Sequence, residues 1–224
     1  MSRDNETLAF EYACLRRWLE QHKDLAQALV ALDFSAYEES SSPETKKDFF
    51  QAVQADNHRH PETALAILYH VGESFQTIGI GESLRWVGLV ADYGAHRLGH
   101  CISLGLGETE LRKLCVNEAQ LRDIQKLQTE TLLRVKEKGA VIESCPQSNL
   151  RIAGIQDLRS HPLCRFVREG LPLVISSDDP GIFRTSLQEE FEFARSQLGI
   201  SQKILRRVAR ESTRWHADRI RVRI

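Results

Sequence analysis

The chain has 224 residues, and its 30 lysines and arginines nearly balance its 31 aspartates and glutamates. This balance gives no overall field that would attract nucleic acid or an anionic membrane, so we expect neither as a partner. The five cysteines are scattered and form no CxxC pair, which argues against a disulfide framework and favours a reducing, cytosolic (cytoplasmic) setting. The sequence shows no signal-peptide pattern and no bilayer-spanning run, so we expect a soluble, unsecreted protein.

Predicted helices and strands alternate along the chain. Apolar residues at helical spacing predict helices, and short apolar runs with polar ends predict strands that are buried on both faces. The predicted helices are residues 6–28, 43–57, 81–94, 117–138 and 161–170, followed by helices that open at a capping-box pattern, Ser186 with Glu189. The predicted strands are residues 28–36, 64–73, 96–105, 140–149 and 171–180. This alternation predicts βαβ units and a parallel sheet within a single domain over residues 1–224.

Four of the predicted strands end in polar side chains that can bind a metal or move a proton. These side chains are His70 with Glu73, His100, Glu143 with Asn149, and Asp178 with Asp179. In parallel α/β proteins the active site forms where the carboxyl ends of the strands meet, so this recurrence indicates an enzyme. Each residue alone also has a structural interpretation: a lone histidine, such as His96 or His161, is more often hydrogen-bonded within the fold, and Asp-Asp-Pro suits a turn.

Four of these segments, in order, resemble motifs of the adenosine deaminase family. They are "YHVGESF", "HRLGHC", "ESCPQSN" and "SSDDPGIF", which are similar to HAGE, RIGHG, E-x-CP-x-SN and TDDP, and "VALDFSAYEE" resembles the preceding DLAGDE strand. The resemblance covers most of the chain from about residue 28 onward. It implies a partial TIM-type (β/α)8 barrel with about the last five of its eight strands.

The resemblance also implies a role for each matching residue. His70 and Asp178 would be ligands of a catalytic zinc ion, and Glu73 would protonate the purine ring at N1. His100 would orient the attacking water and take part in its deprotonation. Asp179 would hold the purine at N7, so that one of the adjacent carboxylates faces the metal and the other the substrate.

The residue at position 36 departs from the family. Ala36 stands where the family has a glycine that contacts the purine through its backbone, and Tyr37 follows it. Cys101 likewise replaces the glycine that follows RIGH, and "HVGESF" is typical of longer bacterial deaminase-like proteins. The implied substrates are therefore adenine nucleotides as well as adenosine, with an inosine-type product and ammonia.

Two further zinc ligands of the family, a His-x-His on the first barrel strand, have no match before residue 28. The chain's own His58-Arg59-His60 lies between two predicted strands and is interpreted as a surface or helix-end feature. A catalytic zinc site takes three or more protein ligands, so we expect a missing N-terminal half-barrel, supplied by another polypeptide or, less favoured, by a homo-oligomer. The alternative is an inactive, truncated deaminase-like protein that acts as a binding or regulatory subunit.

Other classes of protein fit the residues less well. A cytidine-deaminase-type site needs H-x-E followed by P-C-x-x-C, whereas "ESCPQSN" has its cysteine before the proline and no second cysteine. "GIGES", residues 79–83, lacks the third glycine of a dinucleotide fingerprint and is interpreted as a turn.

Overall fold

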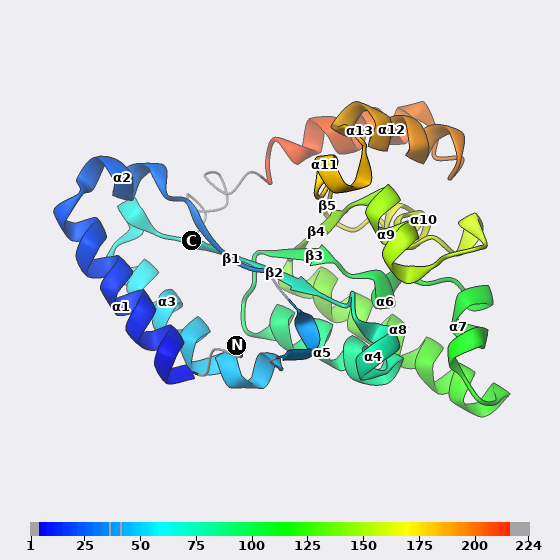
Figure 1. Cartoon of the computed structure of the whole chain (residues 1–224), viewed down its shortest axis with the longest axis horizontal. Coiled ribbons are helices and arrows are strands. Elements are labelled where there is room, and N and C mark those ends of the chain that lie inside the picture. The colour runs from blue at the N-terminus through cyan, green and yellow to red at the C-terminus, as the bar shows by residue number, and fades with distance from the viewer. Residues whose placement is uncertain (1–4, 36, 41, 216–224) are drawn as a thin grey trace.

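A computed structural model describes residues 5–35, 37–40 and 42–215. Five strands form one parallel sheet in the order β1-β2-β3-β4-β5 (Figure 1). The strands are β1 (Ala31–Phe34), β2 (Ala66–Val71), β3 (Arg97–His100), β4 (Val141–Ser144) and β5 (Leu173–Ile175). A sheet whose parallel strands follow one another in sequence, each joined to the next through helices, is the arrangement of a (β/α)8 barrel. The predicted fold class, a partial barrel with five strands, is confirmed.

Helices fill every connection between neighbouring strands. The longer ones are α1 (Asn5–Gln21), α3 (Lys47–Arg59), α5 (Ile80–Asp92), α8 (Glu118–Lys138), α9 (Pro146–Ala153), α10 (Pro162–Glu169), α12 (Leu187–Ser196) and α13 (Gln202–Ser212). The shorter ones are α2 (Lys23–Ala28), α4 (Phe75–Ile78), α6 (Ile102–Gly105), α7 (Glu108–Leu114) and α11 (Pro180–Phe183), with 3-10 turns η1 (Glu38–Ser40), η2 (Pro43–Lys46), η3 (Pro61–Thr63) and η4 (Leu158–Ser160). None of these described helices is long and apolar enough to cross a membrane.

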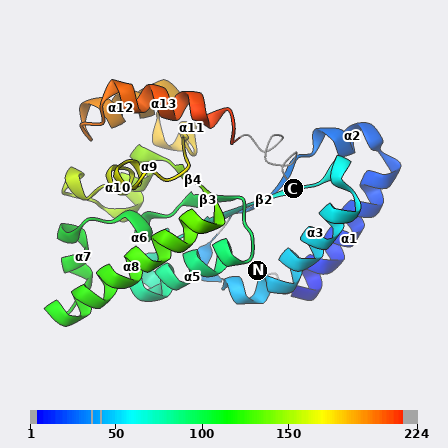
Figure 2. The ribbon, with the colours of Figure 1, turned by 180° about the vertical axis from the view of Figure 1, so that it is seen from behind.

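The core lies between the sheet and its covering helices. Helices α5 and α8 pack against each other (Figure 2). Helix α5 also packs on β2, and α13 packs on β5. The apolar stripe predicted for residues 117–138 is confirmed, because Leu121, Leu132 and Val135 are buried and Gly139 ends the helix in the left-handed conformation. These contacts fix the strands whose ends carry the predicted site.

Several predicted elements are shorter or more broken than the sequence indicates, including the strand predicted over 171–180, of which Leu173–Ile175 forms β5. The helix predicted over residues 6–28 is interrupted at His22, which leaves the helical conformation and divides it into α1 and α2. The strand predicted over 96–105 ends at His100, because His100 and Cys101 both adopt positive φ angles, 60° and 48°, and the chain turns into α6. The strand predicted over 140–149 likewise ends at Ser144, where Pro146 begins α9.

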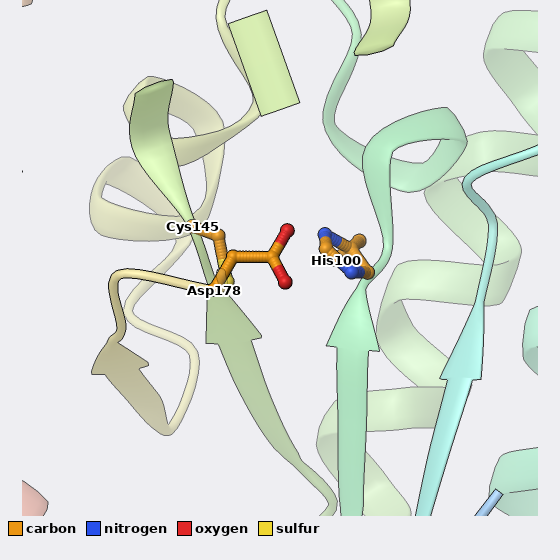
Figure 3. Close-up of side chains that lie close together, drawn as sticks. All are labelled: His100, Cys145 and Asp178. Carbon is orange, nitrogen blue, oxygen red and sulfur yellow. The ribbon is translucent and has the colours of Figure 1, made fainter. Parts of the chain in front are cut away.

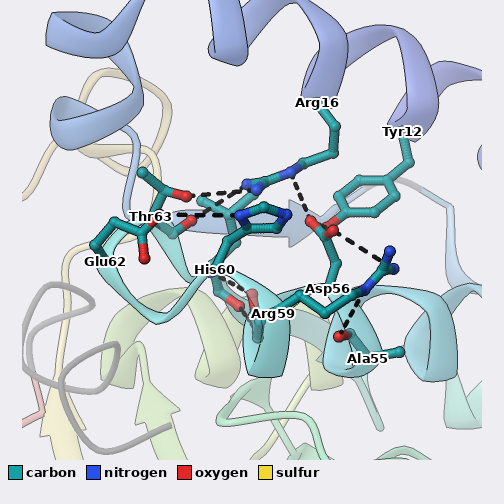
Figure 4. A network of polar contacts seen from close by, with 10 residues as sticks. Tyr12, Arg16, Ala55, Asp56, Arg59, His60, Glu62 and Thr63 are labelled. Atoms are coloured by element: carbon teal, nitrogen blue, oxygen red, sulfur yellow. Dashed lines mark hydrogen bonds and ion pairs between the residues drawn. The ribbon is translucent and has the colours of Figure 1, made fainter.

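A buried charge network attaches α1 to α3 (Figure 4). The carboxylate of Asp56 accepts a hydrogen bond from the Tyr12 hydroxyl at 2.9 Å and pairs with the Arg16 guanidinium at 2.5 Å. Arg16 also donates to the backbone oxygen and hydroxyl of Thr63. The network holds α1 beside the outer edge of the sheet at β1.

Candidate active site

The carboxyl ends of β2 and β3 bring His70 and His100 together. His70 is the penultimate residue of β2 and pairs in register with Gly99, and the next pair is Val71 with His100. The two imidazole rings have centroids 5.3 Å apart. Gly99 makes room for the His70 ring, because a Cβ atom at this position would lie only 2.8 Å from the ring carbon Cδ2.

The orientation of His100 is set by Asn149 in α9. His100 is 3% exposed, and its Nδ1 lies 2.8 Å from the side-chain oxygen of Asn149. With this oxygen as acceptor, Nδ1 carries the proton and Nε2 presents its lone pair to the site. Nε2 lies 3.8 Å from a carboxylate oxygen of Glu73, which follows β2 by two residues. A ring nitrogen of His100 and the carboxyl group of Glu73 therefore face each other across the site.

Asp178 approaches the same place from the loop after β5. Its φ of 56° is in the left-handed region, which is uncommon for a residue other than glycine and is typical of functional sites. The hydroxyl of Ser148 in α9 donates a hydrogen bond to its carboxylate. Figure 3 shows the carboxylate directed across the strand ends toward His100, with Cys145 beside it.

The three side chains in Figure 3 form a possible metal-binding group. One donor atom from each of His100, Cys145 and Asp178 lies within 4.8 Å of the other two. Cys145 is buried, and burial raises the pKa of its thiol, as do the nearby carboxylates. Cys145 lies within one of the matching motifs, but no role was predicted for it from the sequence. A hydrophobic pattern does not distinguish a buried cysteine at a strand end from a core residue.

His70 is held in the way that metal-binding histidines commonly are. Its Nδ1 lies 3.2 Å from an Asp33 carboxylate oxygen and 3.2 Å from the backbone oxygen of Phe34. Burial lowers the pKa of His70, but the hydrogen bond and charge of Asp33, the hydrogen bond to Phe34 and the charge of Glu143 together outweigh it, so the pKa is raised. Nδ1 is thus the donor and Nε2 remains for a ligand, as in a carboxylate–histidine–metal arrangement. Imidazole, carboxylate and thiol donors together fit zinc.

Comparison with known proteins identifies the family of this chain. The sequence model of a family described as adenosine deaminase matches residues 7–217. The chain belongs to the adenosine deaminase family. The family resemblance predicted from the four motifs is therefore confirmed.

Named relatives within the family are deaminases. An adenine deaminase of Sinorhizobium medicae is 30% identical over 165 residues, which are 71% of this chain and 49% of that protein. An aminodeoxyfutalosine deaminase of Streptomyces coelicolor is 30% identical over 168 residues, which are 75% of this chain and 34% of that protein. The chain therefore spans about half or less of the length of these relatives.

Solved structures of deaminases share the fold. The arabidopsis N6-mAMP deaminase superposes with a TM-score of 0.60 at 20% identity, covering 87% of this chain and 48% of the enzyme. An adenine deaminase of Arthrobacter aurescens gives a TM-score of 0.59 at 20% identity, covering 92% of this chain and 54% of the enzyme. The similar arabidopsis protein ADAL has been solved in complexes with IMP and with GMP.

Other residues considered in the sequence analysis fall outside this group of side chains or outside the described residues. Asp179 is exposed at the start of α11, and Ala36 lies outside the described residues. His58 and His60 lie at the end of α3, where β2 is about to begin, and are therefore at the opposite end of the strand from His70. His58 contacts its own helix through the backbone oxygen of Gln54, which fits the predicted helix-end interpretation.

Three other polar residues named in the sequence analysis have structural partners. Glu143 forms an ion pair with Arg97 on the neighbouring strand β3. His96 accepts a hydrogen bond from the backbone of Ile67, and both ring nitrogens of His161 are bonded to backbone groups. The structural interpretation of these two histidines is confirmed.

Proposed function

We propose that this chain carries most of the active site of a zinc-dependent deaminase. The reaction is the hydrolytic removal of the 6-amino group of adenosine or an adenine nucleotide: water adds to C6, the C6–N bond breaks, and an inosine-type product and ammonia leave. The observation that carries the proposal is the convergence of Glu73, His100 and Asp178 from three separate strand ends, with His70 next to them. The five free cysteines suit a reducing cytosol.

Glu73 and His100 divide the proton transfers between them. The Glu73 carboxyl donates a proton to ring N1 as water attacks C6, because the ring accepts the nucleophile only when its nitrogen gains a proton. His100 takes a proton from the attacking water through Nε2 and passes it to the departing amino group, which leaves as ammonia, while Nδ1 keeps its hydrogen bond to Asn149. Asp179 would hold the substrate at N7, and residue 36 would contact it through the backbone.

His70 and Asp178 would hold the zinc ion, and the Cys145 sulfur lies within 4.8 Å of an Asp178 carboxylate oxygen. When bound, zinc supplies a water molecule of lowered pKa near neutrality. Asp33 would orient His70 and Ser148 would orient Asp178, since each is hydrogen-bonded or ion-paired to its partner. Relatives named adenine deaminase and aminodeoxyfutalosine deaminase make the free base and larger nucleosides further substrates for testing.

Activity would require residues that complete the barrel beside β1. Among the described residues, β1 pairs only with β2 and β5 only with β4, so the sheet has two unpaired edges, and a cavity of about 500 Å³ lies against β1. The cavity is lined by apolar residues of α1 and also reaches Asp33 and His70. An additional strand there, from an N-terminal half-barrel polypeptide or from another copy of this chain, would cover the exposed edge and place its own side chains beside His70.

A deamination assay with a matched variant tests this function. The purified chain, alone and with the N-terminal half of a relative, is given zinc and adenosine, AMP or adenine, and ammonia release is measured. We expect turnover that Glu73→Gln abolishes without loss of zinc, because the amide cannot donate a carboxylic proton. Near-normal turnover in Glu73→Gln would refute the assigned role, and purine binding without turnover under every condition would favour a binding or regulatory subunit.

A further inference from the structure

A buried carboxylate lies behind the loop that carries Glu73. Glu38 begins η1 after β1 and is 8% exposed. One of its oxygens accepts a hydrogen bond from the backbone N–H of Gly72 at 2.7 Å. The other accepts from the N–H groups of Glu73 at 2.9 Å and Ser74 at 2.7 Å. Three successive backbone amides therefore converge on one side chain that lies 34 to 36 positions earlier in the sequence.

The carboxylate and the three amides stabilise one another. Burial raises the pKa of Glu38, the three backbone hydrogen bonds oppose that rise, and the negative charge of Glu73 adds to it. A buried carboxylate without hydrogen-bond partners is strongly unfavourable, and buried N–H groups without acceptors are unfavourable as well. Hydrogen bonds to a charged acceptor are also shorter and stronger than neutral ones. When Glu38 is ionised, the loop is consequently held by three charge-assisted hydrogen bonds.

The other side of the loop is held by close packing. Gly72 has a φ of 80°, and a Cβ atom on it would lie 2.9 Å from the hydroxyl of Ser103 and 3.1 Å from the Cα atom of Cys101. Its backbone oxygen accepts a hydrogen bond from the N–H of Ser103. The loop is thus fixed between the end of β3 on one side and Glu38 on the other. The direction in which the Glu73 side chain leaves the backbone is fixed with it.

We infer that Glu38 is a positioning residue that aims the carboxyl of Glu73 at the reacting purine ring, a role that rests on the proposed deaminase function. Glu38 acts on Glu73 through the three backbone amides that its carboxylate binds. The adjacent Tyr37 is 80% exposed and lines the cavity beside His70. The segment with Tyr37 and Glu38 therefore both lines the cavity and holds the loop that carries Glu73. A displacement of this segment would also displace Glu73.

Hydrogen exchange of the whole chain tests the local part of this inference. Glu38→Gln keeps the size of the side chain but replaces one acceptor oxygen with an NH2 group, which cannot accept. Glu39→Gln, at the exposed neighbouring position, is the matched control. We expect the amides of residues 72–74 to exchange about tenfold faster or more in Glu38→Gln, with α5 and α8 unchanged and no change in Glu39→Gln.

Two results would overturn the local claim. Unchanged exchange at residues 72–74 in Glu38→Gln would show that the carboxylate does not hold the loop. An equal acceleration throughout α5 and α8 would show that Glu38 supports the whole fold instead. If Glu38→Gln does not fold, Glu38→Asp decides the same question, since it keeps the charge but is one methylene shorter, and it should loosen the same three amides to a smaller degree.

Steady-state kinetics test the positioning role in a preparation that deaminates. Misplacing a catalytic group by about 1 Å costs on the order of 100-fold in rate, so we expect Glu38→Gln to lower kcat about 10- to 100-fold with KM changed less than about threefold. Glu38→Asp should recover part of kcat. Unchanged kcat alongside a loosened loop would refute positioning. Inactive wild-type protein would refute the proposed function, while the exchange experiment would still decide whether Glu38 holds the loop.

Discussion

Substituting Gly99 tests the placement of His70 at the centre of the site. A methyl group at Gly99 would lie 2.8 Å from Cδ2 and 3.0 Å from Cγ of the His70 ring. Favourable contacts between carbon atoms begin at about 3.5 Å, so in Gly99→Ala the ring has to move by roughly 0.7 Å or more. Inserting a methyl group into a packed position costs about 1–3 kcal/mol, and we expect the free energy of unfolding to fall by this amount.

A double-mutant cycle in urea isolates the clash from other effects. In a His70→Ala background the ring is absent, so Gly99→Ala should lower the free energy of unfolding by less than about 0.5 kcal/mol. The coupling energy between positions 70 and 99 is then on the order of 1–2 kcal/mol. Gly81→Ala is the control, because its added methyl meets only Ile124 Cδ1, at an ordinary contact distance of 3.5 Å. Equal costs of Gly99→Ala with and without His70 would show that the ring does not occupy this position.

Three further predictions concern the metal, a buried histidine and the attachment of α1. Asp178→Ala should lower the zinc content found by elemental analysis, whereas Asp179→Asn should leave it unchanged; equal zinc content in both variants would contradict the ligand assignment. Burial lowers the pKa of His161 to about 4, so by NMR its ring should stay neutral down to about pH 5. In the unfolded chain a histidine binds its proton near pH 6.5, above the pH at which folded His161 does. His161 therefore lowers the free energy of unfolding as the pH falls from about 6.5 to 4. A titration midpoint of His161 near pH 6.5 in the folded protein would contradict this. Tyr12→Phe removes a hydrogen bond to the Asp56 carboxylate and should cost about 1–2 kcal/mol in urea unfolding, and no change would show that Arg16 alone satisfies that carboxylate.

The order of strands and helices was predictable because hydrophobic patterning determines it. Short apolar runs correspond to β1 through β5, and the apolar stripe of α8 corresponds to its buried side. The predicted strands extend beyond the ends of the observed ones, since residues such as His100 and Asp178 adopt left-handed backbone conformations. Nothing in a hydrophobic pattern distinguishes such a residue from a continuing strand, because the conformation is imposed by tertiary contacts.

The candidate site was predictable as a set of residues but not as a set of contacts. His70, Glu73, His100 and Asp178 followed from the ends of the strands and from the family motifs. The partners that orient them, Asp33, Ser148 and Asn149, lie 30 to 49 positions away from the side chains they hold. Long-range hydrogen bonds of this kind depend on the register of the sheet and the entry angle of α9, which a single sequence does not specify.

The two sides of the site differ in how completely this chain supports them. On the β3–β5 side, consecutive residues of α9 hold both functional groups, since Ser148 binds Asp178 and Asn149 binds His100. Gln147, the preceding residue, is itself bonded to Glu190 of α12, so this support extends into the next helical layer. On the β1 side, His70 relies on Asp33, whose side chain is 47% exposed at the wall of the open cavity. A water-exposed pair holds a ring less firmly than a buried one, because solvent competes for both partners. Residues that complete the barrel would therefore bear on His70 from the β1 edge, and they would also meet the other outer strand, β5, which pairs with β4 alone among the described residues.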